Sequence, residues 1–318
     1  MTVKLTIAST SALGMIVWTT AALAGSVTQP GEQVGLAAGA PLPEGIYVVD
    51  TFSVGRRDAP NSPDVGINIP ILIWSTPWKV LGARVEGVFA SPTIAAWTRN
   101  PSGIDNSDTS IFYSPIFGSI FAWDLGGNFG VSYLIGYHFR GGDRGSIVSP
   151  TGGVATPVVP QIASDMVRQG FAASYTGDGW NLTANLTYGL TFDDTARFGG
   201  AVGAALGPIA QADWLNLDLT ATKKFGKFEI GAVAFGSMDL PIDRGKALYA
   251  NYTRVAQFAA GGLIGYDLGP FTAQIYVTRD IVERGYGSAE TRGFFRIIAP
   301  LYTPPATTVA SASPLIRK

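Results

Sequence analysis

Between residues 180 and 192, apolar and polar side chains alternate almost without interruption. One face carries Leu182, Ala184, Leu186, Tyr188, Leu190 and Phe192; the other carries Asn181, Thr183, Asn185, Thr187, Gly189 and Thr191. This period of two predicts a β-strand with two different environments, because successive side chains point to opposite sides. At about 3.3 Å per residue and a tilt of about 45°, a strand of this length crosses the hydrocarbon layer of a bilayer.

Similar patterns recur along the chain and predict about twelve strands, separated by glycine, proline, asparagine and aspartate clusters. The expected ranges are 45–54, 67–75, 80–93, 113–123, 128–140, 168–176, 180–192, 213–225, 228–238, 255–268, 271–280 and 291–302. We expect a tight connection at 76–79 and long loops at 95–112, 141–167 and 193–212.

The connection lengths alternate with a fixed parity. Short turns follow the second, fourth, sixth, eighth and tenth expected strands, while longer segments follow the odd-numbered ones, so long and short connections lie at opposite ends. Outer-membrane barrels have this asymmetry and an even strand number. In lipid, a sheet must close to pair all its backbone groups. We therefore predict an all-β, transmembrane, antiparallel up-and-down β-barrel of about 12 strands, with a secreted β-sandwich or a lipocalin-like barrel as alternatives.

The N-terminus indicates export. Residues 1–24 have a basic residue, Lys4, then an apolar run and an Ala-Leu-Ala sequence before Gly25, which is typical of a cleaved secretory signal. A membrane helix is the alternative interpretation of this segment. We expect residues 25–44 to form an extension, residues 45–302 the barrel, and residues 303–318 a tail. The expected location is the outer membrane of a Gram-negative bacterium.

Composition supports this class and excludes others. The chain has 22 basic and 23 acidic residues; without Lys4 the count is 21 against 23, a net charge of about −2, which implies no binding to nucleic acid. The absence of cysteine excludes disulfides and thiolate chemistry. Charged residues make up only 14 % of the chain and the mean hydropathy is +0.23, which apolar residues spread over alternating strands explain.

If the apolar faces meet lipid, the opposite faces line a lumen. The side chains expected there are Arg84, Glu86, His138, Arg140, Asn216, Asp218, Glu229, Gln257 and Gln274. Charges and hydrogen-bonding groups in such positions can tune the selectivity of a permeation path. The alternative is that they form ion pairs that only stabilise the barrel. The patterns predict no catalytic residue, no cofactor and no metal site.

His138 is the only histidine of the chain. An outer-membrane phospholipase, the enzyme alternative, needs a serine and an acidic or amide group beside such a histidine at the lipid-facing surface. The strand pattern instead places His138 inward, between lipid-facing Tyr137 and Phe139.

Aromatic residues and the extension suggest two further features. Tryptophans near expected strand ends, at positions 74, 78, 97, 123, 180 and 214, are typical of the aromatic girdles at the two membrane interfaces. About a dozen strands enclose a wider lumen than eight do, which motivates the hypothesis that residues 25–44 plug it.

Several motifs point to one family: the opening Leu42-Pro43-Glu44-Gly45-Ile46-Tyr47, the run from Ile69 to Gly82 with its Trp-Ser-Thr-Pro-Trp-Lys block, Ser114-Pro115, and Trp123-Asp124-Leu125-Gly126. In these residues the chain resembles the outer-membrane transporter family named for the meta-pathway of phenol degradation. The resemblance implies a channel for small hydrophobic or aromatic compounds, with membrane lipid and the barrel-assembly machinery as partners. An adhesive barrel with a closed lumen is the alternative. Neither the substrate nor the direction of transport follows from the sequence.

Overall fold

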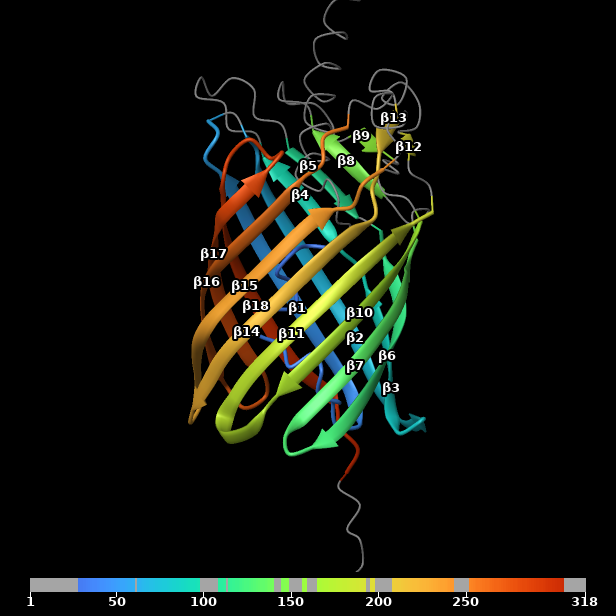
Figure 1. The fold of residues 1–318 in the computed structure, drawn as a ribbon, viewed down its shortest axis with the longest axis vertical. Helices are drawn as coiled ribbons and strands as arrows, with labels where there is room; N and C mark the ends of the chain where they lie inside the picture. Colours follow the sequence, from blue (N-terminus) through green and yellow to red (C-terminus); the bar gives the residue numbers. More distant parts are fainter. Residues whose placement is uncertain are drawn as a thin grey trace, which may run out of the picture.

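The computed structural model describes residues 28–60, 62–97, 108–112, 114–139, 144–148, 156–158, 165–192, 195–197, 208–242 and 252–305. Twelve long antiparallel strands form a closed barrel (Figure 1). They are β1 Gly45–Arg57, β2 Asp64–Val80, β3 Ala83–Ala90, β6 Ile116–Gly126, β7 Phe129–His138, β10 Met166–Tyr175, β11 Trp180–Thr191, β14 Trp214–Phe225, β15 Phe228–Asp239, β16 Ala256–Asp267, β17 Thr272–Arg284 and β18 Glu290–Tyr302. The first strand pairs with both β2 and β18, which closes the ring and confirms the predicted fold.

Six short strands occupy connections that the sequence predicted as loops, so those loop predictions are wrong in part. β4 Thr93–Trp97, β5 Asp108–Phe112, β8 Arg144–Val148 and β9 Thr156–Val158 extend the main sheet, whereas β12 Thr195–Arg197 and β13 Pro208–Ala210 pair separately. The β4–β5 pairing continues the β3–β6 hairpin past an interruption. The strand pairing of β3 with β6 therefore continues into β4 and β5, although the composition of these segments favours turns.

The expected tight connection at 76–79 is also wrong. β2 runs through this segment to Val80, and the reversal falls at Leu81 and Gly82, whose φ angles are 51° and 82°. The β2–β3 register shifts between Ser75 and Lys79, so Pro77 is accommodated in a bulge within the strand instead of a turn.

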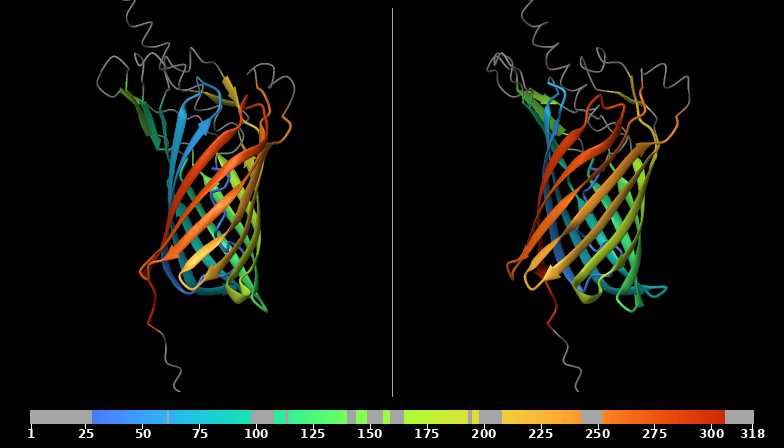
Figure 2. Two further views of the ribbon diagram at one scale, coloured as in Figure 1. Left: turned by 90° about the vertical axis from the view of Figure 1, so that its left-hand side faces the viewer. Right: turned by 60° about the vertical axis from the view of Figure 1, so that its left-hand side comes forward.

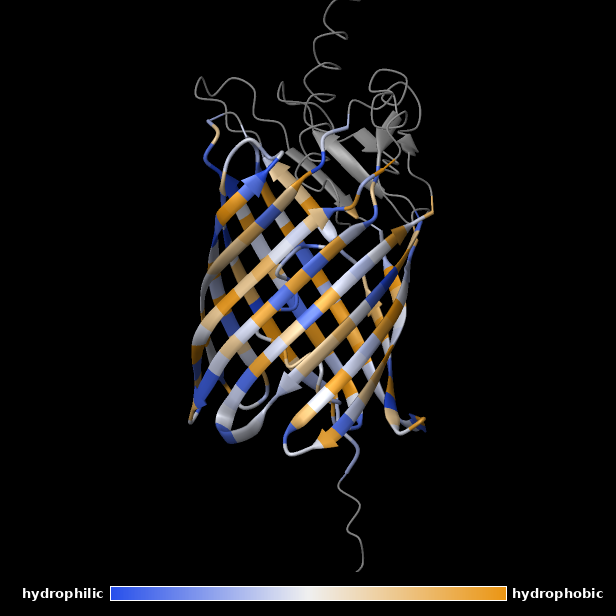
Figure 3. Ribbon diagram, in the orientation of Figure 1, coloured by the Kyte–Doolittle hydropathy of each residue, from blue (hydrophilic) through white to orange (hydrophobic). Residues whose placement is uncertain are grey.

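The two ends of the barrel differ as predicted. The short turns lie at one end, called here the turn end, and the longer connections lie at the other, the loop end (Figures 1 and 2). Along the strands, hydrophobic and hydrophilic residues alternate (Figure 3). In β11, Leu186 is 45 % exposed on the outside and Asn185 is 4 % exposed on the inside, which confirms the two-faced interpretation of this strand.

Aromatic side chains on the outer surface follow the girdle prediction with one exception. Trp74, Trp78, Trp97 and Trp180 are exposed. The prediction is wrong for Trp214, at the start of β14, because this side chain is fully buried and faces inward. Its ring occupies the space that a Cβ on Gly189 would need. No helix among the described residues has the length and apolarity to cross a membrane.

Residues 28–44 lie inside the barrel (Figure 2). They form three successive β-turns, closed by hydrogen bonds from the Glu32, Leu36 and Ala40 amides to the Gln29, Gln33 and Ala37 carbonyls at 3.1, 3.2 and 2.9 Å. The third position of each turn is glycine. Gly31 and Gly35 have φ angles of 82° and 83°, which are typical of this position in a type II turn. We call residues 28–44 the inner segment.

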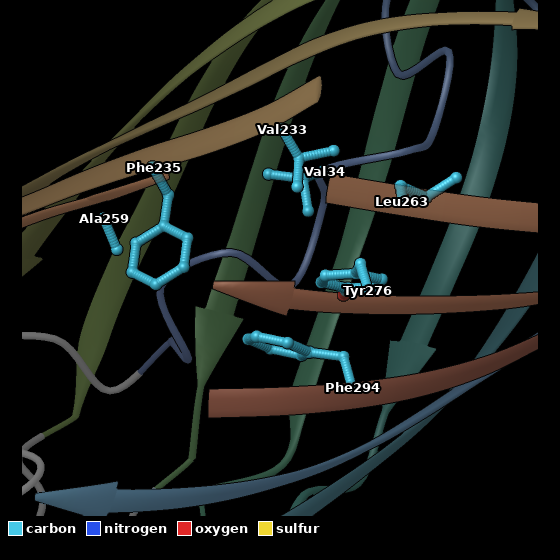
Figure 4. Close-up of a cluster of buried hydrophobic side chains, with 7 residues drawn as sticks. All are labelled: Val34, Val233, Phe235, Ala259, Leu263, Tyr276 and Phe294. Carbon is cyan, nitrogen blue, oxygen red and sulfur yellow. The ribbon is translucent and has the colours of Figure 1, made fainter. Parts of the chain in front are cut away.

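One apolar contact anchors the inner segment to the wall. Val34, at the second position of the middle turn, is fully buried in a cluster formed by four neighbouring strands (Figure 4). The wall members are Val233, Phe235, Ala259, Leu263, Tyr276 and Phe294. The rings of Tyr276 and Phe294 stack at 4.3 Å between centroids. This cluster is the apolar core of the lumen.

Candidate functional site

The central peptide group of each turn in the inner segment is held by the barrel wall. In a type II turn this peptide lies across the turn, so its N–H and C=O cannot bond within the turn. The Gly35 amide donates to Thr220 Oγ1 at 2.7 Å, and Arg296 donates to the carbonyl of Val34 at 2.5 Å. Thr220 lies on β14 and Arg296 on β18. Opposite sides of one peptide group are therefore bound by different strands.

The third turn and the end of the inner segment repeat this arrangement. The Gly39 amide donates to Ser174 Oγ at 2.9 Å, while Ser132 Oγ donates to the Ala38 carbonyl at 2.7 Å. Leu42 donates its amide to Glu86 Oε1 at 2.9 Å. The wall thus satisfies backbone groups that no regular secondary structure satisfies.

Two buried arginines add charge to these contacts. Arg168 pairs with Glu32 of the inner segment at 2.6 Å, and both side chains are buried. Arg296 is fully buried and also donates to the Glu32 carbonyl and to Tyr276 Oη. Removing one partner of such a buried network leaves the other without compensation.

Five of the expected lumenal residues contact the inner segment or each other. Asn216 donates to the Thr28 carbonyl at 3.4 Å, and Asp218 accepts from the Gly31 amide at 3.0 Å. Gln274 donates to both Gly35 O and Glu229 Oε2, at 3.2 and 3.0 Å. Glu86 is the fifth, through Leu42. All five are buried on the inner wall.

The remaining expected residues lie elsewhere. Arg84 is half-buried near the turn end and donates to the Thr76 carbonyl at 2.9 Å. Gln257 is buried on the inner face of β16, and His138 is buried at the loop end of β7. Arg140 lies outside the described residues. His138 lines the same cavity as Glu86, Glu229 and Gln274, and Arg84 lies two residues from Glu86 on β3, whereas Gln257 does not line the cavity.

A cavity of about 500 Å³ lies beside the inner segment, and most of its apolar lining comes from β2, β3, β4 and β6. Its most frequent lining side chain is isoleucine, from eight positions: Ile67, Ile69, Ile71, Ile73, Ile94, Ile116, Ile120 and Ile298. Val49, Val88 and Leu134 add further apolar surface, and polar side chains, among them Glu86, His138, Arg168, Asn185 and Gln274, line the rest. A cavity of this volume, with a mainly apolar surface and polar groups at its margin, suits a small organic molecule.

The isoleucines of β2 contradict the general expectation that inward faces are polar. In this strand both faces are largely apolar: Ile67, Ile69, Ile71 and Ile73 point inward, while Leu72 and Trp74 are exposed outside. A face that packs beside a cavity and an internal segment can be as apolar as one that meets lipid.

The surroundings of His138 differ from those of a catalytic histidine. Its Nδ1 lies 3.1 Å from the backbone carbonyl oxygen of Ser114, not from a serine hydroxyl, and its side chain faces inward. Within the described parts of the chain, no group of three or more histidine, aspartate or glutamate side chains could hold a metal ion.

Polar contacts at the loop end join residues of the connections to residues of the strands. Arg279 donates to both carboxylate oxygens of Asp58, and these hydrogen bonds hold the pKa of Asp58 below its usual range. Burial, followed by the nearby charge of Asp239, raises the pKa of the Tyr252 hydroxyl, which donates to that carboxylate. These contacts tie the β1–β2 connection to β17 and the β15–β16 connection to the end of β15.

Sequence reasoning missed the regular spacing of the inner segment. The letters QPGE, QVGL and AAGA place glycine third in three successive groups of four, which is a turn signal. It also missed Arg168 and Arg296. Both fall on inward positions of strands that were predicted, so the alternation itself could have identified them.

Solved structures support the architecture. The chain resembles the COG4313 outer-membrane channel from Pseudomonas putida F1, with 14 % sequence identity, a TM-score of 0.59, and coverage of 86 % of this chain and 99 % of that one. It also resembles the transport unit of the autotransporter AIDA-I from Escherichia coli, with 11 % identity, a TM-score of 0.51, and coverage of 90 % and 97 %. These likenesses show that the fold is that of outer-membrane barrels. No curated protein matches the chain.

The sequence match is to a family model. Residues 44–297, well over half of the chain, match the model described as "Putative MetA-pathway of phenol degradation". This range runs from the last residue of the inner segment into β18 and includes the strands that line the cavity. The chain therefore belongs to this family.

Proposed function

We propose that the protein is an outer-membrane channel that admits small hydrophobic or aromatic compounds into the periplasm. The observation that carries the proposal is the isoleucine-lined cavity of about 500 Å³ inside a barrel whose outer surface is also apolar. A path for ions or sugars needs polar walls, whereas this one favours an uncharged organic solute. The family description, which names phenol degradation, supports the same class of solute.

The proposal assigns roles to the parts of the chain. Residues 1–24 direct export, and residues 45–302 form the channel in the lipid with the help of the barrel-assembly machinery. Residues 25–44 act as a plug that narrows the lumen to the cavity, for which the contacts of Gly31, Gly35, Gly39 and Leu42 with the wall are the support. The protein performs no chemical conversion of the solute.

A pair of neighbouring substitutions on β3 tests the channel. Val88 lines the cavity, while Phe89 is exposed on the outer surface. Val88→Trp should fill the cavity and abolish most uptake of a radiolabelled aromatic solute, measured in a deletion strain that carries the variant. Phe89→Trp, the control, should leave uptake at the wild-type level. Unchanged uptake in a folded Val88→Trp protein would refute the proposed path.

The plug has a separate test. Deletion of residues 25–40 should raise the conductance of the protein in planar bilayers, because the turns that occupy the lumen are removed. An unchanged conductance would mean that these residues do not narrow the channel. An adhesive barrel with a closed lumen predicts, in contrast, that loss of the protein leaves aromatic uptake unaltered.

A further inference from the structure

Two buried polar atoms near the loop end of the cavity have no partner among the described residues. They are His138 Nε2 and Arg168 Nε. The two side chains are 2 % and 5 % exposed, and both line the cavity. A buried donor or acceptor that is left unpaired costs free energy, and such a group needs an explanation. A ligand that pairs with both atoms would supply one.

The chemistry of the two atoms is complementary. His138 Nδ1 is 3.1 Å from the Ser114 carbonyl, which can only accept, so the neutral ring carries its proton on Nδ1. Nε2 is then a free acceptor. Arg168 uses Nη2 for its ion pair with Glu32, and its Nε–H remains a free donor. The cavity thus offers one acceptor and one donor.

The strand register places these atoms on adjacent parts of the wall. His138 faces Met166 across the β7–β10 pair, and Arg168 lies two residues further along the same face of β10. Residues in this diagonal relation are within reach of long side chains. The partner opposite Arg168 is Gly136, which has no side chain. We call the group His138, Arg168, Gly136 and Ile116 the notch.

Ile116 closes the notch in this structure. It faces His138 across the β6–β7 pair, and its Cδ1 would lie only 2.7 Å from a Cβ on Gly136. The isoleucine side chain therefore occupies the space that glycine leaves free. Rotation of this one side chain toward the cavity, which it also lines, would open the space at Gly136 beside His138 and Arg168.

We propose that the notch binds the hydroxyl group of a hydroxylated aromatic solute whose ring occupies the isoleucine-lined cavity. The hydroxyl hydrogen is donated to His138 Nε2, and the hydroxyl oxygen accepts from Arg168 Nε–H. A bare hydrocarbon leaves both atoms unpaired, an aryl ether can satisfy only the donor, and an aromatic carboxylate has no hydrogen for Nε2. His138 is in this way a specificity-determining residue of the channel, and the inference rests on the proposed function.

The single histidine of the chain allows a direct test. Protein without a histidine tag, labelled with ¹⁵N-histidine and held in lipid nanodiscs, is titrated with phenol, anisole and toluene. Phenol should shift the Nε2 resonance in a saturable way, and anisole and toluene should not. Phenol should also bind about thirtyfold more tightly than toluene, the effect expected of two buried hydrogen bonds that each contribute about fivefold. Equal shifts with all three solutes would overturn the proposal.

Substitutions provide an independent measurement. His138→Leu removes the acceptor and should abolish the preference for phenol over toluene, whereas His138→Gln keeps a carbonyl acceptor and should retain part of it. Gln257→Leu is the control, because Gln257 is a buried inner-wall residue that does not line the cavity. A folded His138→Leu protein with the wild-type preference would refute the inference. If that variant does not fold, the titration of the labelled wild-type protein decides.

The outcomes separate the two proposals. Uptake of aromatic solutes that is blocked by Val88→Trp, together with equal binding of phenol and toluene, would leave the channel intact and reject the notch. Absence of both binding and uptake would reject the channel itself. A shift of Nε2 that does not saturate would indicate only partitioning of phenol into the membrane, and would also reject the notch.

Discussion

The inner wall of the barrel has two unlike sectors. From β14 to β18, the wall presents Asp218, Thr220, Gln274 and Arg296, and these side chains bind the backbone of the inner segment. The sector of β2, β3 and β6 presents isoleucine and valine to an open cavity. We call them the polar sector and the apolar sector. The first binds the inner segment and reaches the cavity only at its margin, through residues such as Gln274, and the second supplies most of the apolar lining of the cavity.

The difference follows from what each sector faces. A chain of turns has peptide groups that it cannot pair within itself, so a wall that packs against it must supply donors and acceptors. A cavity for an uncharged solute requires the opposite, because every polar side chain would need a partner when the solute is absent. One closed sheet can provide both polar and apolar inner surfaces, because the inward side chains of each strand are set by the sequence of that strand alone.

The largest expected effect lies in the polar sector. Arg296→Met leaves the Val34 and Glu32 carbonyls without their buried donor, and should lower the free energy of unfolding by about 3 to 5 kcal/mol, since each unpaired buried acceptor costs about 1 to 3 kcal/mol. Denaturant titration of the protein in micelles measures this. Arg56→Met is the control, because that arginine is exposed and its pair with Asp64 should contribute little to stability. Similar losses in both variants would contradict the proposed anchoring.

A second substitution compares the outside of the wall with the inside. Leu186→Arg places a charge in lipid near the middle of β11 and should cost about 2 to 4 kcal/mol. Asn185→Ala, at the adjacent inward position, removes one hydrogen bond to Gln33 and should cost about 1 kcal/mol. Refolding into vesicles at increasing urea concentration distinguishes the two. A larger loss for Asn185→Ala would reverse the assignment of the faces.

The third prediction tests how closely the inner segment fits the polar sector. Gly35→Ala adds a Cβ 2.6 Å from Leu263 Cδ1 at a φ of 83°, so clash and backbone strain together should cost about 2 kcal/mol. Gly226→Ala, in a turn at φ 62° with open space around it, has the strain alone and should cost about 1 kcal/mol. Thermal unfolding measures both. Equal losses would mean that the segment is loosely seated.

The smallest expected effect is the difference between two valine-to-alanine substitutions, one in each sector. Val233 packs against Val34 and is 2 % exposed, so Val233→Ala should cost about 1.5 kcal/mol in lost burial. Val88 faces the cavity, and Val88→Ala should cost only about 0.5 kcal/mol because its methyl groups have fewer neighbours. Chemical unfolding curves of the two proteins give the comparison. A cost for Val88→Ala as large as that for Val233→Ala would show that the apolar sector is packed.

Much of the barrel could be predicted from the alternation in strands such as β11, where one face is apolar and the other polar. The inward position of His138 followed from the same pattern. In β2, however, both faces are largely apolar, so the hydropathy pattern does not show which face is inside. That decision depends on what lies next to each face in three dimensions. For the same reason, the partners of Gly31, Gly35 and Gly39 could not be read from their regular spacing.

The contacts of the inner segment also bear on how the barrel assembles. Ser132 and Arg296, which hold neighbouring turns, lie 94 and 262 residues away from their carbonyl partners along the chain. Contacts of such long range form late, after the entropy of closing large loops has been lost. Yet β1 and β18 seal the wall around residues that precede β1, and a sealed wall admits no lateral entry. The segment therefore docks either as the last seam forms or by entering through an end of the closed barrel.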